Sequence, residues 1–151
     1  MPVTFLNRKF QSLAIESMEQ EDYLKRQIDQ LGRVLGKALS DLLGLVKKGQ
    51  ARLGIETTVQ TLKTELDLDI QGLTALKQED FIYTLTSEKK FTCAHLEKIA
   101  EILLLMADYK PGYEKKSIYL KCLAIYKYLE NADSTYSLDR QMKIKQIEDM
   151  L

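Results

Sequence analysis

One histidine, two cysteines and several glutamates are the residues of this chain best suited to metal or acid–base chemistry. The histidine, His95, lies in the stretch CAHLEKIAE between Cys93 and Glu97. On a helix, side chains two residues apart point in different directions around the axis and do not converge on one ion. A lone histidine just after a helix start more often caps the helix or lies at the surface. The sequence therefore predicts no metal and no cofactor here.

The sequence also lacks the motifs of common enzyme classes. It contains no GxSxG, no P-loop, no GxGxxG and no HExxH. Glu97 and Glu101 share a helix face, but no Glu-x-x-His accompanies them, which disfavours a di-iron bundle. We therefore expect a protein without catalytic activity.

Residues 109–128 carry chemistry that could suit nucleic acid. They hold five lysines against one glutamate, interleaved with five tyrosines: Lys110, Lys115, Lys116, Lys121, Lys127, Glu114, Tyr109, Tyr113, Tyr119, Tyr126 and Tyr128. Lysine can contact phosphates and tyrosine can stack on bases. However, Tyr119 and Tyr126 share a side with Cys122, where a core is expected. Packed tyrosines with snorkelling lysines are the favoured interpretation, and nucleic-acid binding through 109–128 is the alternative.

Composition sets limits on location and partners. Twenty-two basic and 22 acidic residues give a formal net charge of zero, which argues against a dedicated nucleic-acid or anionic-membrane binder. Cys93 and Cys122 have no metal-ligand spacing, so we expect free thiols in a reducing compartment. The N-terminus lacks a signal-peptide core, and no apolar run approaches the roughly 18 residues of a membrane span. The expected location is the cytoplasm.

The clearest expected element is a helix over residues 20–49. Its apolar stripe has heptad spacing: Leu24, Ile28, Leu31, Leu35, Ala38, Leu42 and Leu45. Apolar residues also flank this stripe, which favours a core helix of a bundle over an isolated zipper. A homodimer through residues 24–46 is a further expectation, with Ile28, Leu31, Leu35 and Leu42 as its self-interface.

The same helix carries a row of small residues at Gly32, Gly36, Ser40 and Gly44. Each glycine inside a helix costs about 0.5–1 kcal/mol relative to alanine. A close crossing by another helix could offset that cost, because such a row forms a groove. We expect close packing there, and a helix broken near Gly44 is the alternative.

The remaining chain predicts a single all-α domain spanning residues 1–151. Residues 1–19, with Leu6, Phe10 and Leu13 at helical spacing, suggest a short helix or an arm docked on the body. Further helices are expected at about 52–66, 70–76, 78–87, 93–109, 113–131 and 138–150, with Thr92 and Ser137 as N-caps and a break at Pro111. The expected fold is a bundle of six to eight helices.

Two segments around KPG resemble a single tetratricopeptide repeat. IAEILLLMADY at 99–109 is similar to its first helix and IYLKCLAIY at 118–126 to its second, with Cys122 at the small position usually held by alanine. The connection is about three residues longer than that family's pattern, and there is no second clean copy. The resemblance implies a C-terminal helical hairpin, not a solenoid. The overall layout also resembles uncharacterised small all-helical bacterial proteins, which implies no activity.

Together these observations predict a helical protein-interaction or scaffold module. The charge is uneven, because residues 56–80 have a net charge of minus four and residues 109–128 of plus four. Helix 113–131 is expected to be mostly buried, with Ile118, Cys122, Ile125 and Leu129 packed against Ile99, Leu103 and Met106. Tyr113, Lys116 and Tyr128 are the residues we expect to face a partner, either another protein or a second copy. No small-molecule substrate is implied.

Overall fold

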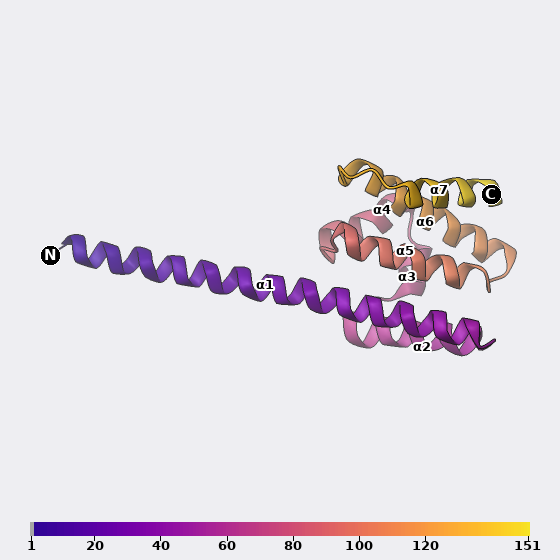
Figure 1. The fold of residues 1–151 in the computed structure, drawn as a ribbon, viewed down its shortest axis with the longest axis horizontal. Coiled ribbons are helices and arrows are strands. Elements are labelled where there is room, and N and C mark those ends of the chain that lie inside the picture. Colours follow the sequence, from indigo (N-terminus) through magenta and orange to yellow (C-terminus); the bar gives the residue numbers. More distant parts are fainter. Residues whose placement is uncertain (1) are drawn as a thin grey trace.

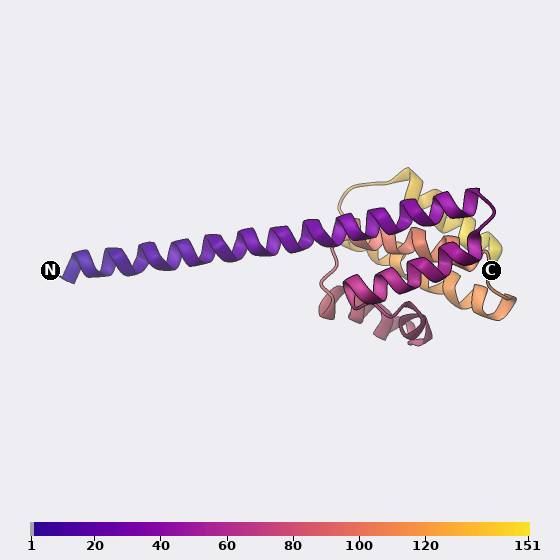
Figure 2. The same cartoon turned by 90° about the horizontal axis from the view of Figure 1, so that it is seen from below.

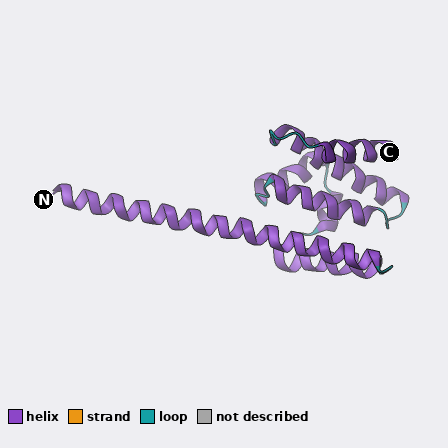
Figure 3. Cartoon of the chain, viewed as in Figure 1, coloured by secondary structure: helices purple, strands orange, loops and turns teal. Residues whose placement is uncertain are grey.

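The computed structural model describes the backbone of residues 2–151 and the side chains of residues 16–151. Every regular element in this part of the chain is helical, as Figure 3 shows. The helices are α1 (Pro2–Lys47), α2 (Ala51–Leu66), α3 (Ile70–Ala75), α4 (Gln78–Tyr83), α5 (Cys93–Ala107), α6 (Gly112–Ala132) and α7 (Leu138–Met150), and one π-helical turn, η1 (Thr84–Glu88), continues α4. The prediction of an all-α bundle of six to eight helices is confirmed.

Helix α1 is far longer than expected and leaves the body over much of its length (Figure 1). Residues 2–19, for which we expected a short helix or a docked arm, continue α1 without a break. The side chains of Leu6, Phe10 and Leu13 lie outside the described residues. Every side chain from Glu16 to Gln30 is exposed, and α1 meets the body near Ile28, whose carbonyl oxygen lies 3.0 Å from His95 Nε2.

The bundle is built from two antiparallel pairs and a covering helix. The C-terminal half of α1 pairs with α2, α5 pairs with α6, and α5 also packs against α1. Helix α7 covers the outer side of α6, and the three layers are visible in Figure 1. The turned view in Figure 2 shows the same separation between the projecting half of α1 and the body.

The core lies mainly between α5 and α6. Helix α6 is the buried helix that its sequence predicts, because Tyr126 and Ile125 are fully enclosed. The residues expected to pack there are all buried in one cluster: Ile118, Cys122, Ile125, Leu129, Ile99, Leu103 and Met106. These contacts bury the apolar face that an isolated α6 would expose to water.

Local signals place the helix ends as predicted. Thr92 Oγ1 accepts a hydrogen bond from the His95 amide, Ser137 Oγ accepts one from the Arg140 amide, and Pro111 precedes α6. Gly49 adopts φ +76°, the left-handed conformation that closes the end of α1. Residues 66–70, with the alternating sequence LDLDI, form no strand. Leu68 is buried in the link between α2 and α3.

Only part of the row of small residues on α1 lies against another helix. Gly32 faces His95 and Gly36 faces Lys98 of α5, both at ordinary van der Waals distance, and nothing lies within 4 Å of a Cβ built at Gly44. The tightest approach of a glycine on one of these long helices to another helix involves a glycine outside the row. A Cβ at Gly54 of α2 would lie 3.1 Å from the Leu45 Cβ atom, so the close contact is between α1 and α2.

Candidate interaction surfaces

The apolar stripe of α1 divides at Leu31. Leu35 and Leu42 are fully buried in the core of their own chain, and Leu31 packs partly against it. Ile28 is 42 % exposed and Leu24 is 55 % exposed. Of the residues predicted for a self-interface, Leu35 and Leu42 are therefore closed to a second copy, while Ile28 and part of Leu31 remain accessible.

The exposed half of α1 is amphipathic and carries charges of both signs, including Lys25 and Arg26. Large apolar side chains at Met18, Tyr23, Leu24 and Ile28 are open to water. They alternate with carboxylates at Glu16, Glu19, Glu21 and Asp22, whose side chains are also exposed. Most helical stability in proteins comes from packing an amphipathic face. This segment therefore gains its stability only once its apolar face is covered.

A second surface is the groove formed by α2, α3 and the start of α6. Its volume is about 1100 Å³. Apolar side chains from these helices, from α5 and from the residue after α3 line it: Ile55, Val59, Ile70, Leu76, Met106 and Ile118. Charged and aromatic residues complete it: Arg52, Glu56, Tyr109, Lys110, Tyr113, Glu114 and Lys121. A groove between helices with an apolar lining and polar rim can take a helix or an extended segment.

Lys121 is the unusual residue of this groove. Its side chain is only 8 % exposed, and its Nζ atom lies 5.8 Å from the centroid of the Phe81 ring. Among the described residues, no hydrogen bond or ion pair to this ammonium is found. Burial lowers the pKa of the Lys121 ammonium, because desolvation disfavours its charged form. Among the described residues, the fully enclosed polar side-chain atoms without a hydrogen-bond partner are Tyr126 Oη and Glu130 Oε1, so the Lys121 stem is buried while its Nζ atom still reaches water.

The sequence does not single out Lys121. It is one of five lysines expected to snorkel from a mostly buried helix. The available signal is its position between Leu120 and Cys122, in a stretch with almost no polar face. That pattern indicates that the aliphatic stem of Lys121 is buried, but it does not show which groups surround the ammonium.

The three residues predicted to face a partner lie in different environments. Tyr113 is 89 % exposed at the groove rim. Lys116 is exposed on the same helix but does not line the groove, and Tyr128 is half-buried against the core. The structure therefore brings only Tyr113 to the groove.

The tyrosines of residues 109–128 divide in the same way. Tyr109 and Tyr113 are exposed, whereas Tyr119 and Tyr126 are buried. The Tyr119 hydroxyl donates a 2.7 Å hydrogen bond to Asp108, and burial together with this bond raises the pKa of Tyr119 to about 12. Two of the five tyrosines are thus unavailable for stacking on bases.

The oppositely charged segments of the sequence meet at the groove. Glu56 lies on its α2 side, while Lys110 and Lys121 lie on its α6 side. Glu56 is exposed and pairs with Arg52 of its own helix at 3.6 Å, so it does not neutralise Lys121. Glu114 also lines the α6 side, so the groove carries charges of both signs.

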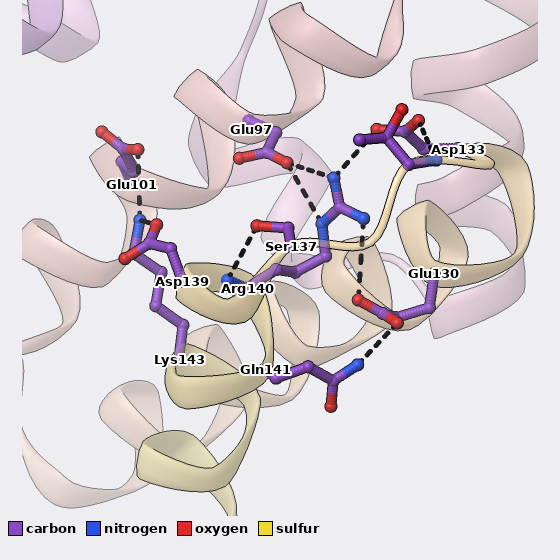
Figure 4. Close-up of polar contacts among 10 residues, drawn as sticks. Glu97, Glu101, Glu130, Asp133, Ser137, Asp139, Arg140, Gln141 and Lys143 are labelled. Carbon is purple, nitrogen blue, oxygen red and sulfur yellow. Dashed lines mark hydrogen bonds and ion pairs between the residues drawn. The ribbon is translucent and has the colours of Figure 1, made fainter.

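The third feature is a polar cluster around Arg140 of α7, which has a structural role (Figure 4). The Arg140 side chain is 3 % exposed. Its Nε donates to Glu97 of α5 at 3.1 Å, and its Nη2 atom donates to Asp133 of the α6–α7 loop at 3.1 Å. An ion pair at 3.6 Å reaches Glu130 of α6. These contacts fix α7 and its loop on the α5–α6 pair.

Comparison with known proteins identifies no relative. No family model, no curated protein and no solved structure matches this chain. None of the helices in the described part of the chain combines the length and hydropathy of a membrane crossing. Within the same residues, no group of three or more His, Cys, Asp or Glu side chains is arranged to hold a metal ion.

Proposed function

We propose that this chain is a non-catalytic helical interaction module of the cytoplasm that associates with a second copy of itself through the exposed half of α1. The observation that carries this proposal is that every side chain from residue 16 to residue 30 is exposed in part or in full, with Leu24 and Ile28 on one face. A helix that leaves its own body with an open apolar face is suited to binding another surface.

The location rests on composition and thiol chemistry. Cys93 and Cys122 are free, and Cys122 is buried, which fits a reducing compartment. The proposal of a non-catalytic role rests on the absence of sequence motifs for nucleophilic, metal or phosphate chemistry. The surfaces that do distinguish this chain are an apolar helix face and a groove, both of which suit protein contacts.

The test is molar mass by light scattering across a range of protein concentrations and salt. We expect the mass to rise above that of the 17.4 kDa chain as concentration increases. The double variant Leu24→Asp/Ile28→Asp should stay monomeric, because it places charges in the apolar contact. Ile28 is 42 % exposed and lies beside His95, so circular dichroism of the double variant should accompany the mass measurement to show that the helices are retained.

Gln30→Asp is the matched control, because Gln30 is exposed on the opposite face of the same helix. It should associate like the unsubstituted chain. A monomer at every concentration, or a double variant of unchanged mass, would refute the proposal. Strong retention on RNA or DNA that falls steeply with salt would support the nucleic-acid alternative instead, because counterion release belongs to that mode of binding.

A further inference from the structure

We propose that α7 is a displaceable helix over a helix-binding face of the α5–α6 pair, and that a partner helix with Arg and Lys three residues apart binds this face when α7 leaves it. The face, called the α7-binding face below, is formed by Glu97, Glu101, Tyr126, Lys127 and Glu130. Helices α1 and α7 lie on opposite sides of the α5–α6 pair in Figure 1. The site is therefore separate from the surface proposed for self-association.

The first argument is the way in which α7 contacts the body. Of its 13 residues, Arg140 and Ile147 are buried, and Ile144 packs partly against the core. Leu138 and Met142, one turn apart, are 63 % and 64 % exposed. A helix held by apolar burial turns its apolar residues inward. Helix α7 instead turns a guanidinium inward and two large apolar side chains outward, so little apolar burial opposes its release.

The second argument is that the interface encloses polar atoms without hydrogen-bond partners. Among the described residues, these fully enclosed side-chain atoms are Tyr126 Oη and Glu130 Oε1. Both residues lie under α7, because the Lys143 ammonium is 5.9 Å from the centroid of the Tyr126 ring and Gln141 donates to Glu130 Oε2 at 2.6 Å. An enclosed polar atom without a partner costs about 1–3 kcal/mol. Release of α7 returns these atoms to water, which offsets part of the contacts that are lost.

The third argument is the charge of the α7-binding face (Figure 4). Glu97 and Glu101 lie one turn apart on α5, and Glu130 of α6 lies beside them around the Arg140 side chain. The one cation of the face is Lys127, which pairs at 4.0 Å with Glu148 in the last part of α7. The face is therefore acidic where it meets the first half of α7, and carboxylates that are uncovered there regain full hydration.

The contacts of α7 define the chemistry that this face recognises. Arg140 meets carboxylates of both α5 and α6, and Lys143, three residues later, meets Glu101 at 3.2 Å. Ile147, four residues after Lys143, is the apolar residue enclosed on the same side. Residues at spacings of three and four share one face of a helix. The α7-binding face therefore fits a helix with the pattern Arg-x-x-Lys-x-x-x-aliphatic.

The loop between α6 and α7 keeps the face covered in the resting chain. Residues 133–137 tether α7, and a short flexible tether gives an effective concentration of roughly millimolar. A partner at lower concentration must therefore bind more tightly than α7 does, or α7 must be weakened. Exchange of α7 between two copies forms no new contact, so the helix that gains from this opening belongs to a different protein.

The main experiment measures binding of a fluorescein-labelled peptide of residues 136–151 to the full chain by fluorescence anisotropy. We expect the peptide to bind the Arg140→Gln chain on the order of tenfold more tightly than the unsubstituted chain, because the substituted α7 competes less well for its own face. A peptide that itself carries Arg140→Gln should bind neither chain. Lys145→Gln is the matched control chain, since Lys145 is exposed on the outer side of α7, and it should behave like the unsubstituted chain.

A second pair of chains tests the face itself. Glu97→Gln/Arg140→Gln should lose most of the peptide binding, because it removes the carboxylate that the peptide arginine would meet. Glu114→Gln/Arg140→Gln is its control, since Glu114 is exposed at the groove between α2, α3 and α6. It should bind the peptide as Arg140→Gln does. Equal binding by these two double variants would overturn the assignment of the face.

Amide exchange of the unsubstituted chain tests the opening without any substitution, and it decides the matter if Arg140→Gln fails to fold. We expect the amides of α7 to exchange through an opening that leaves α5 and α6 protected. High salt should speed that exchange, because it screens the ion pairs that hold α7. The proposal would be overturned if α7 exchanged only together with α5 and α6, or if the peptide bound the folded Arg140→Gln chain no better than the unsubstituted chain.

Discussion

The imidazole of His95 joins α5 to α1 at Ile28, close to the point where α1 leaves the body. Its Nε2 atom lies 3.0 Å from the carbonyl oxygen of Ile28, and its Nδ1 atom accepts a hydrogen bond from the Thr92 amide at 3.1 Å. These partners assign the proton to Nε2, since a carbonyl can only accept. One buried side chain thus completes the cap of α5 and contacts α1.

We predict that His95→Ala lowers the free energy of unfolding by about 1–2 kcal/mol, because it removes one member of a capping box and one contact between helices. Urea unfolding followed by circular dichroism would measure the change. Lys98→Ala is the control one turn along α5, since Lys98 faces Gly36 of α1 and has no cap role. Equal losses for the two variants would contradict the assigned role.

Gly54→Ala and Gly36→Ala should change stability in opposite directions. An added methyl at Gly54 would lie 3.1 Å from both Leu42 Cδ1 and Leu45 Cβ. We expect a net loss of about 1 kcal/mol from this overpacking. At Gly36 the nearest atom is the flexible end of Lys98 at 3.9 Å, so removing a helix glycine should stabilise the fold by about 0.5–1 kcal/mol. Thermal unfolding of both variants decides the comparison.

Arg140→Met should destabilise the chain by about 2–3 kcal/mol, because it leaves several carboxylates of neighbouring elements without their shared cation. Amide exchange should show loss of protection first in α7, which this cluster fixes to the body. Lys127→Met is the matched control, since the Lys127–Glu148 pair is exposed and 4.0 Å long and should cost less than about 1 kcal/mol. A similar cost for both would reject the structural role of Arg140.

Stability should fall at alkaline pH through Tyr119. Burial and the hydrogen bond to Asp108 raise its pKa from 10.0 to about 12. Between these two values the unfolded chain releases the phenol proton while the folded chain retains it, so raising the pH favours unfolding. The contribution is complete below about pH 10 and disappears as the pH passes about 12. Tyr119→Phe should therefore flatten the stability profile across this interval, as measured by urea unfolding at a series of pH values.

Most helix boundaries could be predicted because their signals are local. Thr92 and Ser137 are cap formers directly before helical segments, and Pro111 interrupts one. Each acts on the backbone within a few residues, so the sequence alone contains the relevant interaction. The burial of Tyr126 could also be predicted from the local sequence, because a helix without a polar face must be enclosed.

The candidate site could be predicted only in part, because it depends on which surfaces meet. Periodicity shows that Leu24 and Leu42 share a stripe, but it does not show that other helices cover Leu42 and not Leu24. Arg140 and Glu97 are 43 residues apart in sequence, so their pairing follows from the packing of α7. The groove that Lys121 lines likewise emerges only when α2, α3 and α6 are assembled.

The projecting half of α1 also changes how the molecule diffuses. Residues 2–30 form a rod of about 45 Å at 1.5 Å per residue, attached to a much more compact body. A rod adds frictional drag out of proportion to its mass, so a single chain migrates through a gel-filtration column like a larger sphere. An early elution volume would therefore imitate a dimer even in a monomeric preparation.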